Sequence, residues 1–202
     1  MKLPHDKPTV FLDRDGTIIV EKEYLGDPDQ VCLEEGVIEG LAQLQSMGHP
    51  LIVVSNQSGI GRGKITEDQA LRVNARVDGL LRQNGIELLA WYYCPHAPHT
   101  ECECRKPLPG MALAASRDWG VRLAGSYVIG DKRTDLELAD AVGGTGILVT
   151  KGHGLRDLAW ASANARPVFR HMREAAAYIC ERESDTTARS IEDGRIHATE
   201  TP

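Results

Sequence analysis

TVFLDRDGT, residues 9–17, joins a short apolar run to two aspartates that flank an arginine. The run TVFL has the length and composition of a buried strand, and four similar runs follow it along the chain. Runs that are apolar throughout, rather than alternating with polar residues, are typical of a parallel sheet covered on both faces. The four further runs are LIVV (51–54), LLAWYY (88–93), SYVI (126–129) and GILV (146–149).

Helical patterns occupy the segments between these runs. Thr66 is the expected N-cap of one helix, and another begins beside Pro109 and stops at Gly120. Strands that alternate with helices over short connections predict an α/β fold, with a doubly wound parallel sheet, helices on both faces and no large cap domain. The predicted helices span residues 37–48, 66–85, 109–120 and 132–143, followed by an edge strand at 167–170 and a last helix at 171–182.

The chain has 202 residues and a formal net charge of −6. We predict one folded domain over residues 1–182 and a disordered tail over residues 183–202, because the tail is polar and lacks apolar periodicity. The acidic balance argues against a nucleic-acid partner, and no apolar run approaches the roughly 20 residues that cross a membrane. The first residues show no secretory signal and the five cysteines are an odd number, so we expect a cytoplasmic protein whose thiols are reduced or bound to metal. We also expect a monomer.

The two aspartates of the opening stretch, Asp13 and Asp15, directly follow the first predicted strand. Residues two apart in an extended segment share a face, so both carboxylates are expected to point one way and Arg14 the other. Ligands of open parallel sheets bind at these strand ends. One carboxylate can then act as a nucleophile or metal ligand and the other as an acid–base group. The alternative is a solvated Asp-Gly turn.

Further strand ends also carry polar residues. Ser55 and Asn56 follow the second strand, and Asp131 follows the fourth. Lys106 lies in the loop after the third strand. Asp135 stands one turn beyond the aspartate of the fourth strand, where a carboxylate stabilises a helix N-terminus. The alternative for each of these residues is an ordinary turn or cap.

DRDGT, VVSNQ, the lysine of CRKP and VIGDKRTD stand in the order of the four motifs of the haloacid dehalogenase (HAD) phosphohydrolases. The chain resembles that superfamily over residues 9–150. The resemblance implies hydrolysis of phosphomonoesters, in which Asp13 is the nucleophile that forms an aspartyl-phosphate and Asp15 is the general acid and base. It also implies catalytic roles for Ser55 and Lys106 at the transferred phosphate.

The same resemblance implies a magnesium site. Mg²⁺ prefers oxygen ligands, which would come from Asp13, the backbone carbonyl of Asp15, and Asp131. The ion would screen the repulsion between the anionic nucleophile and the anionic phosphate. Asn56 would donate hydrogen bonds to the substrate.

Residues 94–110, CPHAPHTECECRKPLPG, contain three of the five cysteines. The two short pairs, C-x-H and C-x-C, supply four ligands in a loop with almost no apolar residues, which favours a structural zinc site. A redox pair at 102/104, unliganded thiols, and His99 as a competing ligand are the alternatives. The predicted zinc ligands are Cys94, His96, Cys102 and Cys104.

This loop resembles one in a HAD branch that contains heptose-bisphosphate and histidinol-phosphate phosphatases, both with CPH followed by CxCRKP. The zinc would fix the loop so that Arg105 and Lys106 reach the substrate rigidly. NQSGIGRG, RKPLPGM and GDKRTDLELA resemble the heptose side. That side implies removal of the 7-phosphate from D-glycero-D-manno-heptose 1,7-bisphosphate, a sugar phosphate of lipopolysaccharide precursor biosynthesis. Histidinol-phosphate hydrolysis and a non-catalytic zinc-stabilised binding module are the alternatives.

A bisphosphate substrate needs a sugar pocket and a second anion site. The resemblance implies that Glu21 to Tyr24 line the sugar pocket, although EKE at 21–23 replaces the usual Asp-His-Gly. The usual NQSGIARG has alanine at the position of Gly61, and we expect this change only to loosen the turn. The candidate cations for the second anion site are Arg62, Lys64, Arg105 and Lys132.

Overall fold

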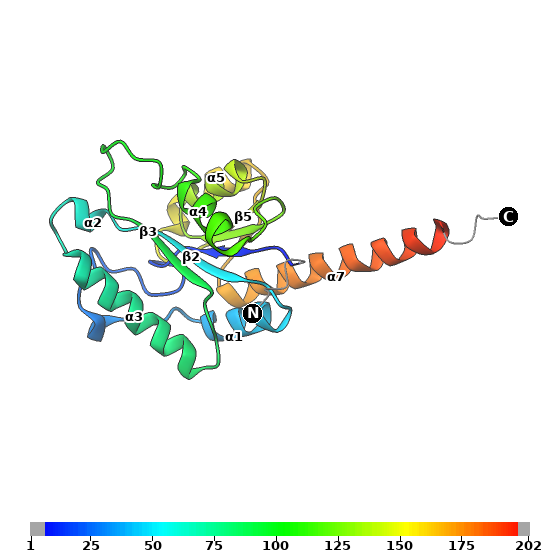
Figure 1. Ribbon diagram of the computed structural model, residues 1–202, viewed down its shortest axis with the longest axis horizontal. Coiled ribbons are helices and arrows are strands. Elements are labelled where there is room, and N and C mark those ends of the chain that lie inside the picture. Colours follow the sequence, from blue (N-terminus) through cyan, green and yellow to red (C-terminus); the bar gives the residue numbers. More distant parts are fainter. Residues whose placement is uncertain (1–6, 198–202) are drawn as a thin grey trace.

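Six parallel strands form one sheet in the order β3-β2-β1-β4-β5-β6 (Figure 1). The structure, a computed structural model, describes the backbone of residues 7–197 and the side chains of residues 7–184. Every predicted strand is present, and the predicted doubly wound α/β fold is confirmed. The strands are β1 (Val10–Leu12), β2 (Leu51–Asn56), β3 (Ala90–Cys94), β4 (Tyr127–Gly130), β5 (Thr145–Val149) and β6 (Val168–Phe169).

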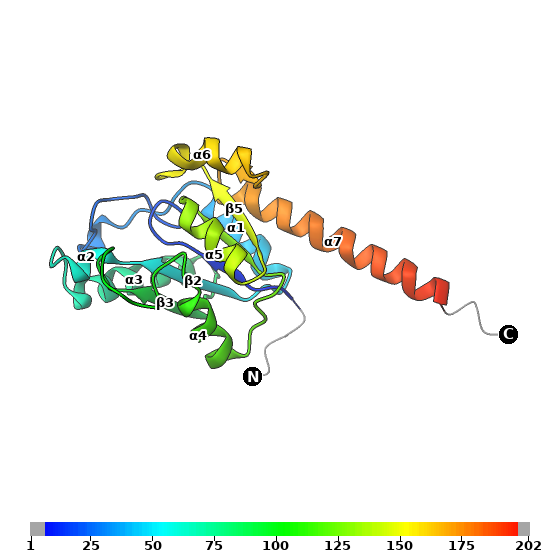
Figure 2. The ribbon, with the colours of Figure 1, turned by 90° about the horizontal axis from the view of Figure 1, so that it is seen from above.

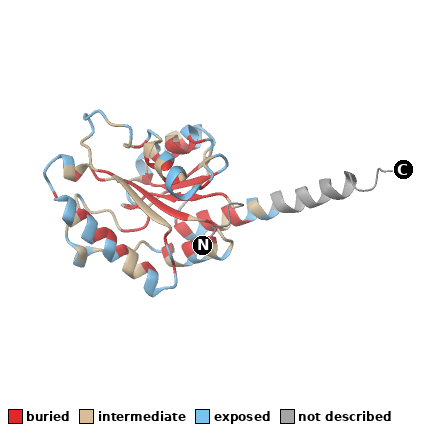
Figure 3. Cartoon of the chain, in the orientation of Figure 1, coloured by how far each residue is buried: buried red, intermediate tan, exposed pale blue. Residues whose placement is uncertain are grey.

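The alternating side chains of β1 divide the core into two layers. Val10 and Leu12 belong to one cluster of buried side chains, and Phe11 belongs to the cluster on the opposite face. Helices enclose the sheet on both sides (Figure 2), and the buried residues concentrate in the strands and on the helix sides that face them (Figure 3). The first face is covered by α1 (Val37–Ser46), α3 (Glu67–Gln83) and α7 (Met172–His197), and the second by α4 (Gly110–Trp119) and α5 (Arg133–Ala141).

Local signals set helix ends where the sequence predicts them. Thr66 Oγ1 accepts a hydrogen bond from the backbone N–H of Gln69 at 3.1 Å, and Gln69 Oε1 accepts one from the N–H of Thr66 at 2.8 Å. This reciprocal capping box begins α3 and confirms the predicted N-cap. Gly120 ends α4 with a φ of 66°, in the left-handed region that glycine adopts without steric cost.

One helix of ten residues lies outside the predicted set. In this helix, α6, only Gly154 and Ala161 are buried. Two shorter helical segments were also not predicted, since each has four residues or fewer. The three segments are α6 (Gly154–Ala163), α2 (Ser58–Gly61) and the 3₁₀ turn η1 (Pro28–Gln30).

The last helix continues beyond its predicted end at residue 182, because the backbone of α7 is helical as far as His197. The disordered tail that the sequence predicts over residues 183–202 stays a prediction. A helix anchored on the sheet through Ala175 and Ile179 needs no new nucleation to continue. The rest of the predicted tail, residues 198–202, lies outside the described residues. Among the helices of residues 7–197, α7 included, none has the length and hydropathy of a membrane-crossing segment.

The carboxyl ends of β1, β2 and β4 meet at one edge of the sheet. The backbone N–H of Asp13 donates to the carbonyl of Ile129 at 2.9 Å, which ties the end of β1 to β4. Ser55 is the last residue but one of β2, and Asp131 follows β4 directly. The fold therefore brings three of the predicted site residues to neighbouring positions at this edge.

Candidate active site

A lysine and two aspartates form a buried charged group at this edge. Lys106 Nζ lies 2.6 Å from Asp13 Oδ1 and 2.6 Å from Asp135 Oδ1. The same ammonium group donates to the carbonyl of Val54 at 2.7 Å. The lysine is 3% exposed and the two aspartates 5% and 1%. The predicted approach of Asp13 to Lys106 is therefore present, and a second aspartate shares the lysine.

The charges in this group stabilise one another. Burial alone would raise the pKa of Asp13, but the ammonium groups of Lys106 and Lys132 outweigh it and hold that pKa below its usual range. Burial opposes the charge of Lys106, yet Asp13 and Asp135 raise its pKa above the usual value. An ionised carboxylate beside a charged ammonium suits attack on an anionic phosphate, because the cation offsets the repulsion.

Asp135 also caps α5, as its position in the sequence predicts. Its Oδ2 accepts a hydrogen bond from the backbone N–H of Lys132 at 3.1 Å. Gly130 leaves the space that this side chain fills, since a Cβ there would collide with the Asp135 carboxylate. Burial, only partly opposed by Lys106, raises the pKa of Asp135 to about 6. One carboxylate thus fixes both the helix and the lysine.

Asp131 lies beside the charged group with no exposed surface. Its Oδ2 accepts a hydrogen bond from the backbone N–H of His153 at 2.7 Å. Its Oδ1 has no hydrogen-bond partner among the described residues and lies 3.4 Å from Lys132 Nζ. Burial, and then the negative charge of Asp13, raises the pKa of Asp131 to about 8. A cation bound here would neutralise a carboxylate that the protein leaves only partly compensated.

The residues at this edge fit a magnesium ion. Carboxylate oxygens of Asp13, Asp131 and Asp135 lie within 4.8 Å of one another. Hard oxygen donors of this kind are the ligands of Mg²⁺, and Asp131 has a buried Oδ1 without a hydrogen-bond partner among the described residues. Gly16 and Gly152 crowd the same place, because a Cβ on either would collide with Asp131 Oδ2. The cluster therefore offers a small cradle lined by oxygen and bare backbone.

Asp15 pairs with its neighbour Arg14 and does not belong to the carboxylate cluster. Arg14 Nε and Nη2 donate to the two carboxylate oxygens at 3.1 Å and 3.0 Å. The guanidinium is 1% exposed and also donates to Asn74 Oδ1 at 2.7 Å and Gln57 Oε1 at 2.9 Å. The prediction that Arg14 points away from the aspartates is therefore wrong. Buried acceptors on α3 and after β2 draw the guanidinium inward, where each of its three nitrogens finds a partner.

Gln57 links two predicted site residues. Its Nε2 donates to Asp15 Oδ2 at 2.7 Å and to Ser55 Oγ at 2.9 Å. Asn56 makes two hydrogen bonds with the backbone of Lys106, at 3.1 Å and 3.0 Å. The sequence did not single out Gln57, although it belongs to the VVSNQ motif, because a glutamine side chain alone does not indicate a role.

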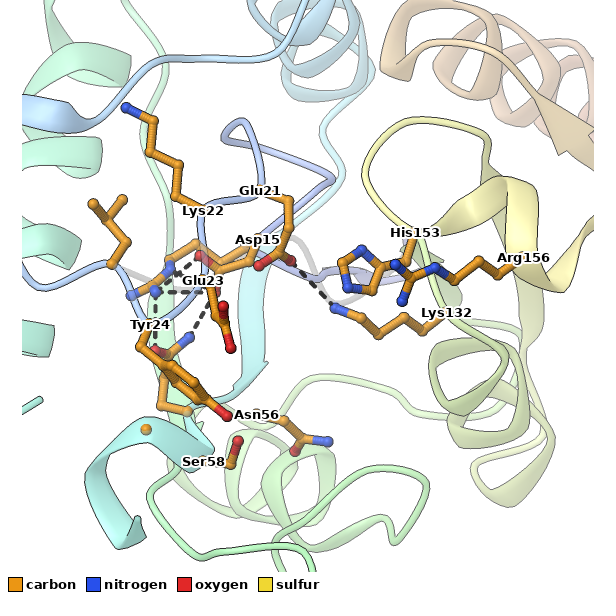
Figure 4. A pocket seen from close by; sticks show the side chains of 14 residues that line it. Asp15, Glu21, Lys22, Glu23, Tyr24, Asn56, Ser58, Lys132, His153 and Arg156 are labelled. Atoms are coloured by element: carbon orange, nitrogen blue, oxygen red, sulfur yellow. Dashed lines mark hydrogen bonds and ion pairs between the residues drawn. The ribbon is translucent and has the colours of Figure 1, made fainter. Parts of the chain in front are cut away.

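A polar cavity of about 480 Å³ opens beside Asp15 (Figure 4). Cavities of this size accommodate small ligands. Glu21 and Lys132 face each other across it, with their charged atoms 3.5 Å apart. The predicted site residues that line it are Asp15, Glu21, Tyr24, Asn56 and Lys132.

Three predicted cations do not line this cavity. Arg62 and Lys64 are exposed residues of the turn that follows α2. The guanidinium of Arg105 donates to the carbonyl of His96 at 3.4 Å and so is held by the cysteine loop. The structure therefore does not bring these three side chains to the cavity wall.

Two residues that the sequence did not predict as site residues line the cavity on the side of Lys132 (Figure 4). His153 precedes α6, and Arg156 lies in its first turn. Burial, and then the positive charge of Lys132, lowers the pKa of His153 below its usual value. The stretch KGHG follows the end of β5, and this position at a strand end was the signal available in the sequence.

The segment after motif one forms the opposite wall. Tyr24 has a φ of 52°, which is uncommon for a residue with a side chain. Its ring packs so close to Gly59 that a Cβ there would lie 2.7 Å from a ring carbon. Burial raises the pKa of Glu21, although Lys132 opposes the effect. The wall thus presents a fixed aromatic ring and an acid to a ligand.

The four predicted zinc ligands converge. Cys94 Sγ lies 3.5 Å from His96 Nδ1 and 3.8 Å from Cys102 Sγ, and His96 Nδ1 lies 3.3 Å from Cys104 Sγ. Zinc–sulfur bonds of about 2.3 Å in a tetrahedron place sulfur atoms about 3.8 Å apart, so the spacing fits the metal. The three cysteines of the cluster are free thiols, and His99 is exposed and outside the cluster.

Gly61 does more than loosen a turn, so that prediction is wrong. A Cβ at this position would lie 2.6 Å from the backbone nitrogen of Ala97 and 2.7 Å from the carbonyl oxygen of Pro95. The N–H of Gly61 donates to the same carbonyl at 2.8 Å. The glycine therefore lets α2 lie directly against the loop that carries the cysteines.

Comparisons of the sequence agree with this site. A family model described as HAD-hydrolase-like matches residues 103–175. The chain is 41% identical over 181 residues to the D-glycero-beta-D-manno-heptose-1,7-bisphosphate 7-phosphatase of Vibrio cholerae, covering 86% of this chain and 96% of the relative. The enzyme of the same name from Escherichia coli K12 is 42% identical over 153 residues, which are 72% of this chain and 80% of the relative.

The chain is also similar to solved structures of heptose bisphosphate phosphatases. The D,D-heptose 1,7-bisphosphate phosphatase from B. bronchiseptica, complexed with magnesium and phosphate, superimposes with a TM-score of 0.80 at 29% identity. The match covers 87% of this chain and 99% of that one. The corresponding enzyme from Burkholderia thailandensis gives a TM-score of 0.64 at 28% identity, over 86% of this chain and 99% of that one.

Proposed function

The chain belongs to the D-glycero-beta-D-manno-heptose-1,7-bisphosphate 7-phosphatases of the HAD superfamily, and on that premise we propose that it removes the 7-phosphate of D-glycero-D-manno-heptose 1,7-bisphosphate. It is a HAD-type phosphatase, a hydrolase of phosphoric monoesters. The observation that carries the substrate proposal is the buried pair of Asp13 and Lys106 beside a cavity lined by further cations. Such a site suits a phosphoryl group with a second anion attached.

The first half of the proposed reaction forms a covalent intermediate on Asp13. A carboxylate oxygen attacks phosphorus in line, the bond from phosphorus to the sugar oxygen breaks, and Asp15 gives its proton to that oxygen. In the second half, water attacks phosphorus, Asp15 takes the proton of the water, and Asp13 leaves as a free carboxylate. The lowered pKa of Asp13 supports its role, since the nucleophile must be ionised.

Magnesium is the proposed cofactor, with ligands from Asp13, the backbone carbonyl of Asp15, and Asp131. Bound there, Mg²⁺ would supply positive charge that offsets the repulsion between carboxylate and phosphate. The unpartnered buried oxygen of Asp131 supports this assignment. Asp135 would hold Lys106 in place beside the ion through their 2.6 Å ion pair.

Lys106 and Ser55 are the proposed partners of the transferred phosphate oxygens. The ammonium is buried and already beside the nucleophile, so it needs little rearrangement to bind them. The hydroxyl of Ser55 accepts from Gln57, which leaves its own proton free for a phosphate oxygen. Asn56 supports the lysine through the backbone and reaches the cavity itself.

The second phosphate of the substrate would bind at the wall formed by Lys132 and Arg156. Both line the cavity, whereas Arg62 and Arg105 do not. Lys132 now pairs with Glu21 at 3.5 Å, and a phosphate would compete for the same ammonium. Glu21 and Tyr24 remain the proposed contacts for the sugar. We therefore assign the distal anion to the far wall of the cavity.

Zinc in the cysteine cluster is proposed as structural. Four protein ligands leave no open position for water, so the ion would hold the loop and not the substrate. Thiolate ligands of this kind require a reducing compartment, which supports the proposed cytoplasmic location. The proposed partner is a small phosphorylated sugar of lipopolysaccharide precursor metabolism, acted on by a monomer.

Phosphate release with Mg²⁺ tests the proposal. We expect kcat/KM for the heptose bisphosphate to exceed that for histidinol phosphate by about a hundredfold or more, which corresponds to roughly 2.7 kcal/mol in the transition state. The reverse preference would assign the chain to histidinol phosphate. Poor turnover of both substrates, with good turnover of simple phosphate esters, would support the phosphatase mechanism and contradict the proposed substrate.

A further inference from the structure

We propose that Arg14 and Gln57 form a clamp on Asp15 that leaves one oxygen, Oδ1, to exchange the proton with the leaving group. The inference rests on the proposed function, because it takes Asp15 as the acid and base. It adds two positioning residues that act through the carboxylate of Asp15.

The hydrogen bonds of Asp15 define which oxygen is free. An ionised carboxylate has about four lone-pair positions, two on each oxygen. Oδ2 accepts from Gln57 Nε2 at 2.7 Å and from Arg14 Nε at 3.1 Å. Oδ1 accepts from Arg14 Nη2 at 3.0 Å and from no other donor among the described residues. The position left open is on Oδ1, so only this oxygen carries a proton without losing a hydrogen bond.

The clamp is itself held by buried partners. Arg14 Nη1 donates to Asn74 of α3 at 2.7 Å, and Nη2 donates to Gln57 Oε1 at 2.9 Å. Gln57 is held in turn by Ser55 at 2.9 Å. Arg14, Gln57 and Asn74 are 1%, 6% and 7% exposed. Because these side chains are fixed by packing and hydrogen bonds, the carboxylate is oriented before the substrate arrives.

Charge explains why an arginine suits this place. In the first half of the reaction the proton leaves Oδ1 for the sugar oxygen as the bond to phosphorus breaks, and Arg14 stabilises the carboxylate that remains. In the second half Oδ1 takes a proton from water as the water oxygen bonds to phosphorus. Gln57 keeps Oδ2 occupied in both halves, so the same oxygen serves in both directions.

The alternative is that Arg14 only fills the space between β1 and α3. The two roles differ in their dependence on the leaving group. An alkyl phosphate needs a proton on its departing oxygen, whereas p-nitrophenolate departs without one. Loss of orientation at Asp15 therefore slows formation of the aspartyl-phosphate from the alkyl ester selectively, while a damaged scaffold slows both esters alike.

The experiment compares kcat/KM for the heptose bisphosphate and for p-nitrophenyl phosphate in Arg14→Lys, Gln57→Met and Asp15→Asn, because kcat/KM reports the steps up to the intermediate. Gln57→Met carries the test if Arg14→Lys does not fold, as judged by thermal unfolding. Arg166→Lys is the control, since Arg166 also makes a two-pronged pair, with Asp140 at 2.8 Å and 2.5 Å, away from the cavity.

We expect Asp15→Asn to lose about a hundredfold or more on the bisphosphate and far less on the aryl ester. The two clamp variants should show the same selectivity at about tenfold, and the control should show none. Equal losses on both esters in the clamp variants, with selectivity in Asp15→Asn, would overturn the clamp alone. No selectivity in Asp15→Asn would overturn the acid–base role of Asp15, and the clamp with it.

Discussion

Asn56 and the main chain of Lys106 exchange two hydrogen bonds. Asn56 Nδ2 donates to the carbonyl oxygen of Lys106 at 3.1 Å, and the N–H of Lys106 donates to Asn56 Oδ1 at 3.0 Å. A side chain at the end of β2 therefore fixes the backbone of the loop that carries the buried ammonium. The side-chain amide of Asn56 thus pairs with the N–H and the carbonyl of one residue, as a neighbouring strand would.

Replacing Asn56 by alanine is expected to lower kcat by about tenfold and the free energy of unfolding by about 1–3 kcal/mol, because the N–H and the carbonyl of Lys106 both lose their partner. Steady-state kinetics and urea unfolding measure the two effects. Asn164→Ala is the matched control, since it removes a hydrogen bond from Asn164 Nδ2 to the carbonyl of Trp160 at an exposed site. An Asn56→Ala enzyme with unchanged kcat would contradict the inferred support of Lys106.

Replacing Lys106 by methionine leaves two buried carboxylates without their cation. We expect a loss of about 3–5 kcal/mol in the free energy of unfolding, as for other buried pairs that lose one partner, and a fall in kcat of about a hundredfold or more. Adding Asp135→Asn should restore part of the stability and none of the activity. A double variant no more stable than Lys106→Met would show that the Asp135 carboxylate costs little once it has lost its 2.6 Å ion pair.

The cysteine cluster is expected to bind one zinc ion per chain. Cys104→Ser should lose the metal, melt at a lower temperature and turn over more slowly, because the loop before Lys106 would lose its anchor. His99→Ala should keep the metal, since His99 lies outside the cluster. Metal analysis of the purified variants decides the matter. Loss of zinc from His99→Ala would place that histidine among the ligands.

Removal of magnesium should expose the cost of the buried carboxylate at position 131. Without metal, Asp131→Asn is expected to be as stable as the wild type or more stable. The substitution removes a carboxyl group whose pKa burial raises to about 8, which means that the folded protein disfavours its ionised form. With Mg²⁺ at a hundred times its Kd, the wild type should gain about 2.7 kcal/mol and the variant almost nothing. Thermal unfolding with and without Mg²⁺ measures this. Asp140→Asn, an exposed carboxylate outside the cluster, should respond like the wild type.

Protonation of His49 is expected to contribute a loss of stability in mild acid. Its Nδ1 lies 2.8 Å from the carbonyl oxygen of Pro8, and burial lowers its pKa. Below a pH of about 6.5 the unfolded chain binds a proton at His49 that the folded chain does not, so the contribution of this residue to the free energy of unfolding falls as pH falls, by up to about 1.4 kcal/mol per pH unit. The loss ends below the folded pKa.

Urea unfolding between pH 7.5 and pH 5 checks this, with His49→Asn as the comparison. The amide nitrogen of asparagine can donate to the same carbonyl but does not titrate. The free energy of unfolding of the wild type, relative to that of the variant, should therefore fall as the pH falls. Equal slopes would mean that other groups cause the acid sensitivity.

The sequence predicts the sheet well because its strands are buried on both faces. A strand such as LIVV, between two helix layers, has no polar side, and its apolar run is visible without any partner. Thr66 and Gly120 are similar cases, since a cap depends on residues within one turn. Three of the four motifs likewise stand at strand ends, which any parallel sheet brings to one edge.

What the sequence does not predict depends on contacts between distant segments. Arg14 turns inward because Asn74 of α3 offers an acceptor sixty residues further along the chain. Gly61 is needed because α2 meets the backbone of Ala97. Arg156 lines the cavity from α6, a helix that lies outside the predicted set. Each of these contacts exists only after the layers have packed.

β3 lies at the edge of the sheet, with β2 as its single neighbour, and it ends at Cys94. An edge strand has only one neighbouring strand to hold it. The loop that follows β3 nevertheless carries Lys106 to the centre of the charged group. With zinc bound, the segment from Cys94 to Cys104 becomes a closed ring, and ring closure removes freedom that the edge would otherwise allow. The position of the buried Lys106 side chain then depends on a metal site at the edge of the sheet. A thiophilic chelator would act as an inhibitor of this enzyme without ever entering the substrate cavity.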